Sequence, residues 1–304
     1  MVQVAYNELS DINKAWLFTG ADAWAFPHND PDQAIDFSGF PSNSTFVLDQ
    51  YIDLINNSTL GLYFQITATI LSGTPSAWSS LSSNAGSISP AGGTLAFLWQ
   101  PKRTCPTSRV LETLRVKVAA YSDVSYSVLY GEDSIDFTYH FFSHSSGGVK
   151  DFTDFEEGSW EGWAQTSGFG TITVQYAYSG SSSVKMFKSG VNNYTVDSSG
   201  QKIPNQDHYI SKTYDLSGYA HAYLVIHSTR HVAGSGDEYA KILRIWTSTK
   251  DFIIRVNRAS ATFNPIRIAV PLPCVNDTVK IASGFNSDTS CMWIDSIIIT
   301  TFSS

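Results

Sequence analysis

Short runs in which apolar and polar residues alternate recur along this 304-residue chain, separated by stretches rich in Gly, Ser, Asn and Pro. Residues 114–121 show the pattern plainly, because Arg115 and Lys117 alternate with apolar side chains. Alternation with a period of two suits a β-strand with one buried face, whereas an amphipathic helix repeats every 3.6 residues. Aromatic residues make up 13% of the chain, which also favours strands. We therefore predict an all-β protein.

The length predicts two domains, because a typical domain has roughly 100–150 residues. Residues 143–150 are mostly small and polar and follow a strongly aromatic strand, so they form the best linker. We predict two tandem antiparallel β-sandwiches, with domains at 1–148 and 149–304. The strands before the linker suggest an immunoglobulin-like sandwich, and the eight or nine strands after it suggest a jelly roll.

A few segments of the N-terminal half do not follow the strand pattern. Residues 82–93 are rich in Ser, Gly and Asn, which predicts turns rather than a strand. Residues 8–14 and 49–55 are the two places where a helical turn is expected.

Charge narrows the range of partners. The chain carries a net charge of −8, and residues 1–148 contain 13 acidic and 6 basic side chains. A nucleic-acid or anionic-membrane partner is not expected, because phosphate binding requires a basic patch. No apolar run reaches the roughly 18 residues of a membrane span. Residues 1–16 are too polar for a signal-peptide core, so either a leader has been removed or the protein leaves the cell by another route, such as inside a virion.

The chain has three cysteines. Cys274 and Cys291 flank a predicted hairpin, and they either form a disulfide or are two small buried apolar residues. No Cys/His cluster with zinc-ligand spacing is present.

Four pieces of the C-terminal half follow one another in an order that is typical of one superfamily. They are the opening 154–163 (DFEEGSWEGW), then 179–186 (SGSSSVKM), then 210–226 (ISKTYDLSGY…AYLVI), and the closing 293–299 (WIDSIII). Together they span nearly all of residues 151–304, which resemble the jelly-roll superfamily of carbohydrate-binding modules and related adhesion domains. The pattern reports the fold more than the ligand. The whole chain loosely resembles viral and plasmid surface proteins such as adhesins, turrets and fibres, in style and not by a motif.

The resemblance implies a structural calcium ion. In such domains the first and last strands lie side by side, so the opening Glu156 and the closing Asp295 would share one cation. Asp154 and Glu157 are nearby candidates, and carbonyl oxygens would complete a shell of six to eight oxygens. One departure is Ser296, which stands where the closing motif has a second acid. Without a cation, these acids would be solvated or hydrogen-bonded at strand ends.

The resemblance also implies binding of a glycan or cell-surface polysaccharide on exposed aromatic rings. For each ring taken singly, a role in packing is the stronger alternative, since Tyr is common on half-buried strands. Trp163 and Trp293 belong to the fold motifs and are expected in the core. The candidate sugar-contacting residues are Trp160, Tyr176, Tyr178, Tyr194, Tyr209 and Trp246.

No catalytic constellation accompanies these motifs. Glu156 and Glu157 are adjacent, so on a strand they point to opposite faces and cannot flank one glycosidic bond. We predict a non-enzymatic adhesin of the cell exterior or a virion surface. The alternatives are a structural virion or surface-layer subunit, forming a homo-oligomer or larger assembly, and a glycoside hydrolase or its accessory module.

Overall fold

In the computed structural model, the described residues are 24–25, 30–40, 44–48, 50–156, 158–166, 168–174, 181–196, 202–232, 242–256, 267–285 and 291–303. β-Strands dominate these residues, and the only helical segments among them are two 3₁₀ turns, Pro75–Ala77 and His144–Ser146. The all-β prediction is therefore confirmed. No helix in this part of the chain has the length and apolarity of a membrane span.

The chain divides into two compact units. The N-terminal unit contains residues 31–142. The C-terminal unit contains residues 143–304 together with a short piece that includes Trp24, Ala25 and Asp30. That piece joins the later unit because β1 (Trp24–Ala25) pairs in parallel with β22 (Arg267–Leu272). Lys250 Nζ also forms an ion pair with Asp30 at 3.0 Å.

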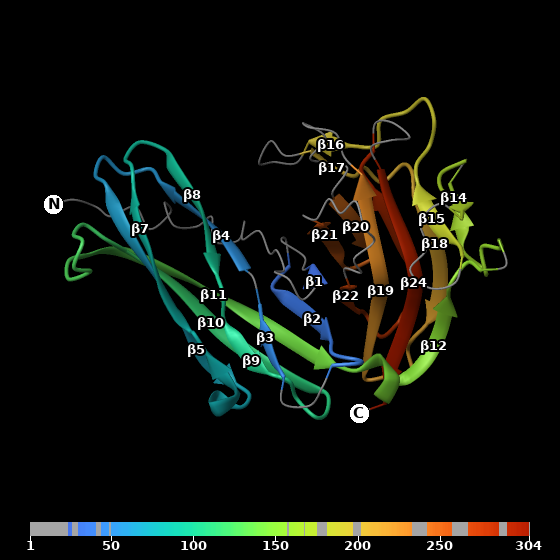
Figure 1. The fold of residues 1–304 in the computed structure, drawn as a ribbon, viewed down its shortest axis with the longest axis horizontal. Helices are drawn as coiled ribbons and strands as arrows, with labels where there is room; N and C mark the ends of the chain where they lie inside the picture. Colours follow the sequence, from blue (N-terminus) through green and yellow to red (C-terminus); the bar gives the residue numbers. More distant parts are fainter. Residues whose placement is uncertain are drawn as a thin grey trace. The chain divides into compact units, whose positions relative to one another are not determined.

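The main sheet of the N-terminal unit has five strands in the order β2-β11-β10-β5-β7. Figure 1 shows its long hairpin of β10 and β11. Their bounds are β2 (Asp32–Asp36), β11 (Leu129–Phe142), β10 (Val110–Tyr121), β5 (Leu62–Ser72) and β7 (Ser82–Ile88). A smaller sheet joins β3 (Thr45–Val47), β9 (Lys102–Thr104) and β6 (Trp78–Ser79), and β4 (Gln50–Asn56) pairs with β8 (Gly93–Trp99). The immunoglobulin-like assignment of this unit stays a prediction.

Two local predictions in this unit are wrong. Residues 82–88, expected as turns, form the edge strand β7, which pairs with β5 from Leu62↔Ile88 to Thr67↔Ser82. Residues 49–55, expected to hold a helical turn, include most of β4. In both places backbone pairing with a neighbouring strand overrides weak local preference. Residues 8–14 lie outside the described part of the chain.

A closed ionic cluster lies in the N-terminal unit, and we call it the buried cluster. Glu112 accepts from Arg103 Nη2 at 2.8 Å and Nε at 3.1 Å, and from Trp78 Nε1 at 2.6 Å. The Arg103 guanidinium also lies 5.1 Å from the centre of the Phe141 ring. The Arg103 and Glu112 side chains are 5% and 1% exposed. Both oxygen atoms of the Glu112 carboxylate thus accept hydrogen bonds from protein side chains.

The C-terminal unit is built from two larger sheets. The first has seven strands in the order β1-β22-β19-β24-β15-β14, with β12 also paired to β24, and the second has the order β13-β18-β23-β20-β21. Figure 1 shows β19 and β24 running side by side. The further strands of the first sheet are β19 (His221–Val232), β24 (Cys291–Phe302), β15 (Ser183–Met186), β14 (Thr171–Thr173) and β12 (Gly148–Thr153). Those of the second are β13 (Ala164–Gln165), β18 (Ile210–Asp215), β23 (Asn276–Ser283), β20 (Ile242–Trp246) and β21 (Asp251–Arg255).

One apolar core joins the facing sides of these two sheets. It includes Ile226 and Ile297 from the first sheet and Leu243, Ile254 and Ile281 from the second. Burial of such side chains supplies about 1.5–3 kcal/mol each and is the main force that holds the sandwich together. The described strand pairs of the protein are antiparallel, except for β1–β22 and β2–β11.

The predicted core residues and the cysteines are placed within this framework. Trp163 and Trp293 are 4% and 2% exposed and belong to the core, as predicted. Cys274 and Cys291 are free thiols, as is Cys105. Cys291 lies in the core and Cys274 packs against it, so these two act as small apolar side chains and not as a disulfide.

Candidate functional site: an aromatic face on the C-terminal unit

The side of the five-stranded sheet that faces away from the core carries aromatic and charged residues. In β20 the core takes Leu243 and Ile245, so the alternation of the strand sends Arg244 and Trp246 to the opposite side. Cross-strand register brings Lys280 of β23 next to Trp246. We call the surface formed by Tyr209, Arg244, Trp246, Asp251 and Lys280 the aromatic face.

Two predicted sugar-contacting residues meet on this face. The rings of Tyr209 and Trp246 pack edge to face with centroids 5.3 Å apart and an interplanar angle of 79°. Trp246 is only 6% exposed, because its neighbours cover it, whereas Tyr209 is half-buried. Trp246 therefore supports the Tyr209 ring, and Tyr209 is the ring that a ligand could reach.

An ion pair holds the adjoining part of the face. The Arg244 guanidinium makes two parallel bonds to the Asp251 carboxylate, at 2.9 and 2.6 Å. A third bond from Arg244 Nη1 reaches the carbonyl of Pro204 at 2.9 Å. The guanidinium also lies 5.7 Å from the centre of the Trp246 ring. This fork geometry fixes the charge in one place, and Asp251 stays 40% exposed.

A lysine completes the face. Lys280 Nζ lies 5.3 Å from the centre of the Tyr209 ring, within the range of a cation–π contact. Among the described residues it forms no salt bridge, so its ammonium hydrogen atoms remain available to a ligand. The face therefore offers a ring for stacking beside charged hydrogen-bonding groups.

A short hairpin stands beside this face. It is made of β16 (Thr195–Val196) and β17 (Lys202–Ile203). Ile203 anchors it through a small apolar cluster with Ile242 and Ile253, which also point away from the main core. The hairpin region holds Tyr194, a further predicted sugar-contacting residue, with Lys202 Nζ 4.6 Å from its ring centre.

The other predicted aromatic residues fall elsewhere. Trp160 is half-buried, packs against the core and meets the Phe155 ring edge to face at 6.2 Å. Gly170 allows this packing, because a Cβ there would lie 2.9 Å from the Trp160 ring. Tyr176 and Tyr178 lie outside the described residues. Sequence reasoning missed Arg244, Asp251 and Lys280, although the alternation of residues 242–246 was a signal that Arg244 shares a side with Trp246.

Asp295, one of the acids predicted to bind calcium, lies where β24 changes partner. β24 pairs with β12 from Ile297 to Thr301 and with β15 from Met292 to Ile294, so Asp295 and Ser296 fall at the changeover. β12 and β24, the strands that open and close residues 148–302, are thus neighbours, as the resemblance implied. Ser296 has a φ of 53° and Phe155, just after β12, has a φ of 61°. We call this place the strand junction.

Glu156 ties the strand junction to the turn before β15. Its carboxylate accepts from the amides of Ser182 at 2.9 Å and Ser181 at 2.9 and 2.7 Å. These backbone hydrogen bonds, that from Ser182 foremost, lower the pKa of the Glu156 carboxyl. The residue thus stays charged at neutral pH.

Two further acids approach the strand junction. Glu161 accepts from the Phe155 amide at 2.8 Å. Burial, joined by the negative charge of Asp154, raises the pKa of the Glu161 carboxyl. Asp295 is fully buried and accepts from the Ser296 amide at 2.7 Å. Within the described residues no group of three or more His, Cys, Asp or Glu side chains could hold a metal ion, and Glu157 lies outside them.

Comparisons with known proteins give only weak similarities. No protein-family model matches the chain, and a search of curated proteins gives no match. A family 22 xylan-binding domain from Paenibacillus barcinonensis is 14% identical, covers 52% of this chain and 97% of its own, and has a TM-score of 0.33.

Two other solved structures give similar values. A cleaved adhesin domain of Lys-gingipain from Porphyromonas gingivalis is 15% identical over 51% of this chain and 100% of its own, with a TM-score of 0.32. A family 35 carbohydrate-binding module from Clostridium thermocellum is 16% identical over 50% and 99%, also with a TM-score of 0.32. TM-scores of this size do not establish a shared fold, so the architecture rests on the sheet topology itself.

Proposed function

We propose that this chain is a non-enzymatic adhesin that presents a glycan-binding C-terminal unit on a cell or virion surface. The observation that supports the proposal is the aromatic face, where Trp246 backs Tyr209 edge-on and Lys280 extends over the same ring. A pyranose ring has one apolar side, which stacks on an aromatic ring, and hydroxyl groups, which bond to charged side chains.

The residues of the face would act in different ways. Tyr209 would contact the apolar side of the sugar, and Trp246 would hold Tyr209 in place. Lys280 would donate to hydroxyl groups, and Asp251, which is partly exposed, would accept from them. Nothing in this arrangement pairs a general acid with a nucleophile, so the role that we propose is binding without cleavage.

Affinity at one such site would be low. A single half-buried ring with a few hydrogen bonds leaves about 4–8 kcal/mol after ordering costs, which corresponds to millimolar to micromolar binding. Firm attachment would then need many copies, as in a homo-oligomer or on a virion or cell surface, where avidity multiplies weak contacts.

A glycan array with the full chain tests the proposal. We expect the wild type to bind an extended polysaccharide and Tyr209→Ala to lose at least tenfold in affinity, because about 1.4 kcal/mol of stacking is removed. Tyr130→Ala, which removes a half-buried Tyr of the N-terminal unit, is the matched control and should bind normally. Absence of any bound glycan in the wild type would favour a purely structural subunit.

We also propose a structural calcium ion at the strand junction. The proposal is supported by Asp295 at the changeover of β24, and by Asp154 and Glu156, which follow the end of β12 and are joined by a hydrogen bond from the Glu156 amide to the Asp154 carboxylate at 3.2 Å. Because the described side chains do not form a complete metal site, backbone carbonyl oxygens would have to supply part of the shell. Glu156 would exchange some of its amide hydrogen bonds for the ion.

Chelation tests the calcium proposal. An ion at a hundredfold excess over its Kd stabilises the folded state by about 2.7 kcal/mol, so EDTA should lower the melting temperature of the full chain. Glu156→Gln should abolish that response, whereas Glu132→Gln, which removes an exposed carboxylate of the N-terminal unit, should keep it. Identical melting curves of the wild type with calcium and with EDTA would contradict the proposal.

A further inference from the structure

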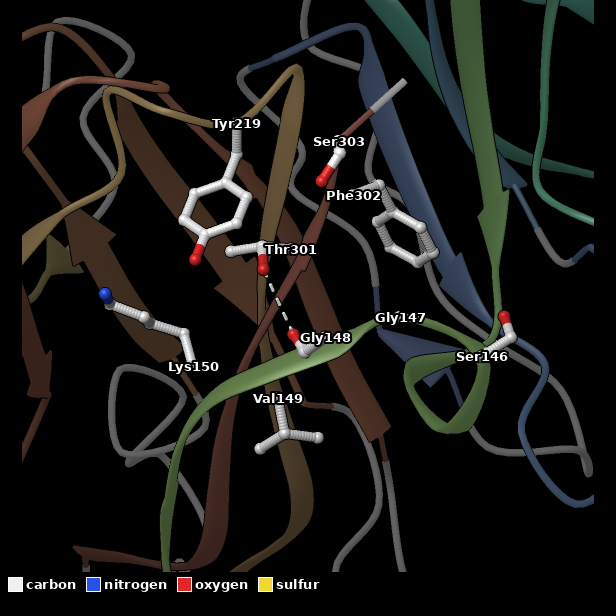
Figure 2. Close-up of a pocket in the computed structure, with 9 residues that line it drawn as sticks. All are labelled: Ser146, Gly147, Gly148, Val149, Lys150, Tyr219, Thr301, Phe302 and Ser303. Atoms are coloured by element: carbon white, nitrogen blue, oxygen red, sulfur yellow. Dashed lines mark hydrogen bonds between the residues drawn. The ribbon is translucent and has the colours of Figure 1, made fainter.

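A pocket of about 400 Å³ lies in the C-terminal unit where β12 begins and β24 ends. The strand junction lies at the other end of β12. Figure 2 shows it between the first residues of β12, the turn that carries Tyr219 and the last residues of β24. None of its lining residues belongs to the aromatic face. The volume falls in the range of about 300–1,000 Å³ that is usual for small-molecule sites.

Glycine shapes one wall of this pocket. A Cβ at Gly147 would lie 2.5 Å from Thr300 Oγ1 and 3.0 Å from the Thr301 carbonyl oxygen, so only glycine lets the chain lie this close to β24. The next carbonyl, that of Gly148, accepts from Thr301 Oγ1 at 3.1 Å, as the dashed line in Figure 2 marks. This wall of the pocket therefore consists of glycine backbone without side chains, held by a hydrogen bond to β24.

Two aromatic rings line the rest of the pocket. Figure 2 shows Tyr219 and Phe302 on either side of Thr301, with the Lys150 side chain below Tyr219. The Lys150 ammonium lies 5.9 Å from the centre of that ring. Rings of this kind offer a surface to the apolar side of a sugar, and the Tyr219 hydroxyl can both donate and accept.

The charge of the lining has one sign. Lys150 is exposed and makes no salt bridge with any described residue. Its charge reaches Asp215, but that carboxylate is already held by the amide and hydroxyl of Ser217, at 3.1 and 2.7 Å. The pocket lining itself contains no acid. An anionic group in the pocket would thus meet one cation, Lys150, and no acid of the lining, because Asp215 lies outside the lining residues.

We propose that this pocket binds a pyranose ring that carries a carboxylate, such as a hexuronate. The ring would lie against Tyr219 or Phe302, its hydroxyl groups would bond to the backbone and hydroxyl groups of the lining, and its carboxylate would pair with Lys150. This second sugar site is separate from the aromatic face and needs no residue of that face.

Amide chemical shifts of the ¹⁵N-labelled full chain test this proposal. We expect D-glucuronate to shift the amides of Gly147 and Gly148 saturably in the millimolar range. D-Glucose supplies the ring without the charge and acetate supplies the charge without the ring, so each should shift these amides far less. Equal shifts with glucose, shifts with acetate alone, or no saturable shift with glucuronate would each overturn the proposal.

Matched variants assign the effect to the lysine. Lys150→Gln should weaken glucuronate binding at least tenfold, whereas Lys150→Arg, which keeps the charge, should retain it. Lys280→Gln removes the corresponding lysine of the aromatic face and should leave these shifts unchanged. Full binding by Lys150→Gln would also overturn the proposal. Because Tyr209→Ala reports on the aromatic face alone, the two sites can fail separately.

Discussion

The buried cluster of the N-terminal unit and the aromatic face of the C-terminal unit use similar residues for different ends. Each combines a Trp, an Arg bonded twice to a carboxylate, and a second aromatic ring. In the buried cluster the Glu112 carboxylate is 1% exposed and bonds to Trp78 as well as Arg103. In the aromatic face the Asp251 carboxylate is 40% exposed, and Lys280 adds a second cation.

This difference in exposure distinguishes a cluster that stabilises the folded unit from one that is able to bind a ligand. A fully buried ion pair is expensive to break, because the remaining charge has no water to solvate it. A half-exposed pair contributes little to stability, because solvent screens it. Exposure therefore predicts that substitutions in the buried cluster act on folding, whereas those at the edge of the aromatic face act on ligand binding.

The largest effect is expected from Glu112→Gln. This substitution leaves Arg103 charged and buried, which should cost about 3–5 kcal/mol in the unfolding of the N-terminal unit. Urea unfolding of the full chain, followed by fluorescence, measures the loss. Asp136→Asn is the control, because its pair with Arg115 is 41% and 52% exposed, and it should cost less than about 1 kcal/mol. Similar losses in both variants would break the comparison.

Trp246→Ala should have the next largest effect, because it combines lost packing with lost binding. Removal of this covered ring should cost about 3 kcal/mol in the C-terminal unit and should also abolish glycan binding. Tyr209→Ala should weaken binding at least tenfold with less than half of that stability cost, since its ring is already partly exposed. Melting curves and the glycan assay on both variants measure the two effects. An unchanged melting temperature in Trp246→Ala would contradict the predicted order of stability losses.

Asp251→Asn should have the smallest effect on folding. The Asp251 carboxylate is 40% exposed, and Arg244, which is 12% exposed, keeps its bond to the Pro204 carbonyl, so the loss should stay below about 1 kcal/mol. Because the ring platform is untouched, glycan affinity should change by less than about tenfold, which is 1.4 kcal/mol. A stability loss as large as that of Glu112→Gln would show that exposure does not distinguish the two clusters.

Much of the strand content was accessible from sequence, because alternation is a local property. Residues 114–121, predicted as a strand, lie within β10, and the closing motif at 293–299 lies within β24. The errors fell where local preference is weak. The small polar residues of β7 and the mixed residues of β4 became strands only because β5 and β8 were there to pair with them.

The candidate site was predictable only in part. The sequence indicates Tyr209 and Trp246 only as two separate aromatic candidates. Their ring contact is not visible in it, because they lie 37 positions apart along the chain. The hydrogen bonds from the amides of Ser181 and Ser182 to Glu156 could not be predicted from the sequence. The resemblance implied only a cation beside this carboxylate. Lys150 belongs to the predicted linker at 143–150, yet it lines a pocket with the end of β24.

The all-β class and the burial of Trp163 and Trp293 follow from the amino-acid pattern alone, because periodicity and motif residues indicate which side chains are buried. Which polar side chains the strands bring together depends on the three-dimensional arrangement. Arg103 and Glu112 became a closed pair and Arg244 and Asp251 an open one because different neighbours cover them. Exposure depends on contacts between residues distant in sequence, and no local pattern contains that information.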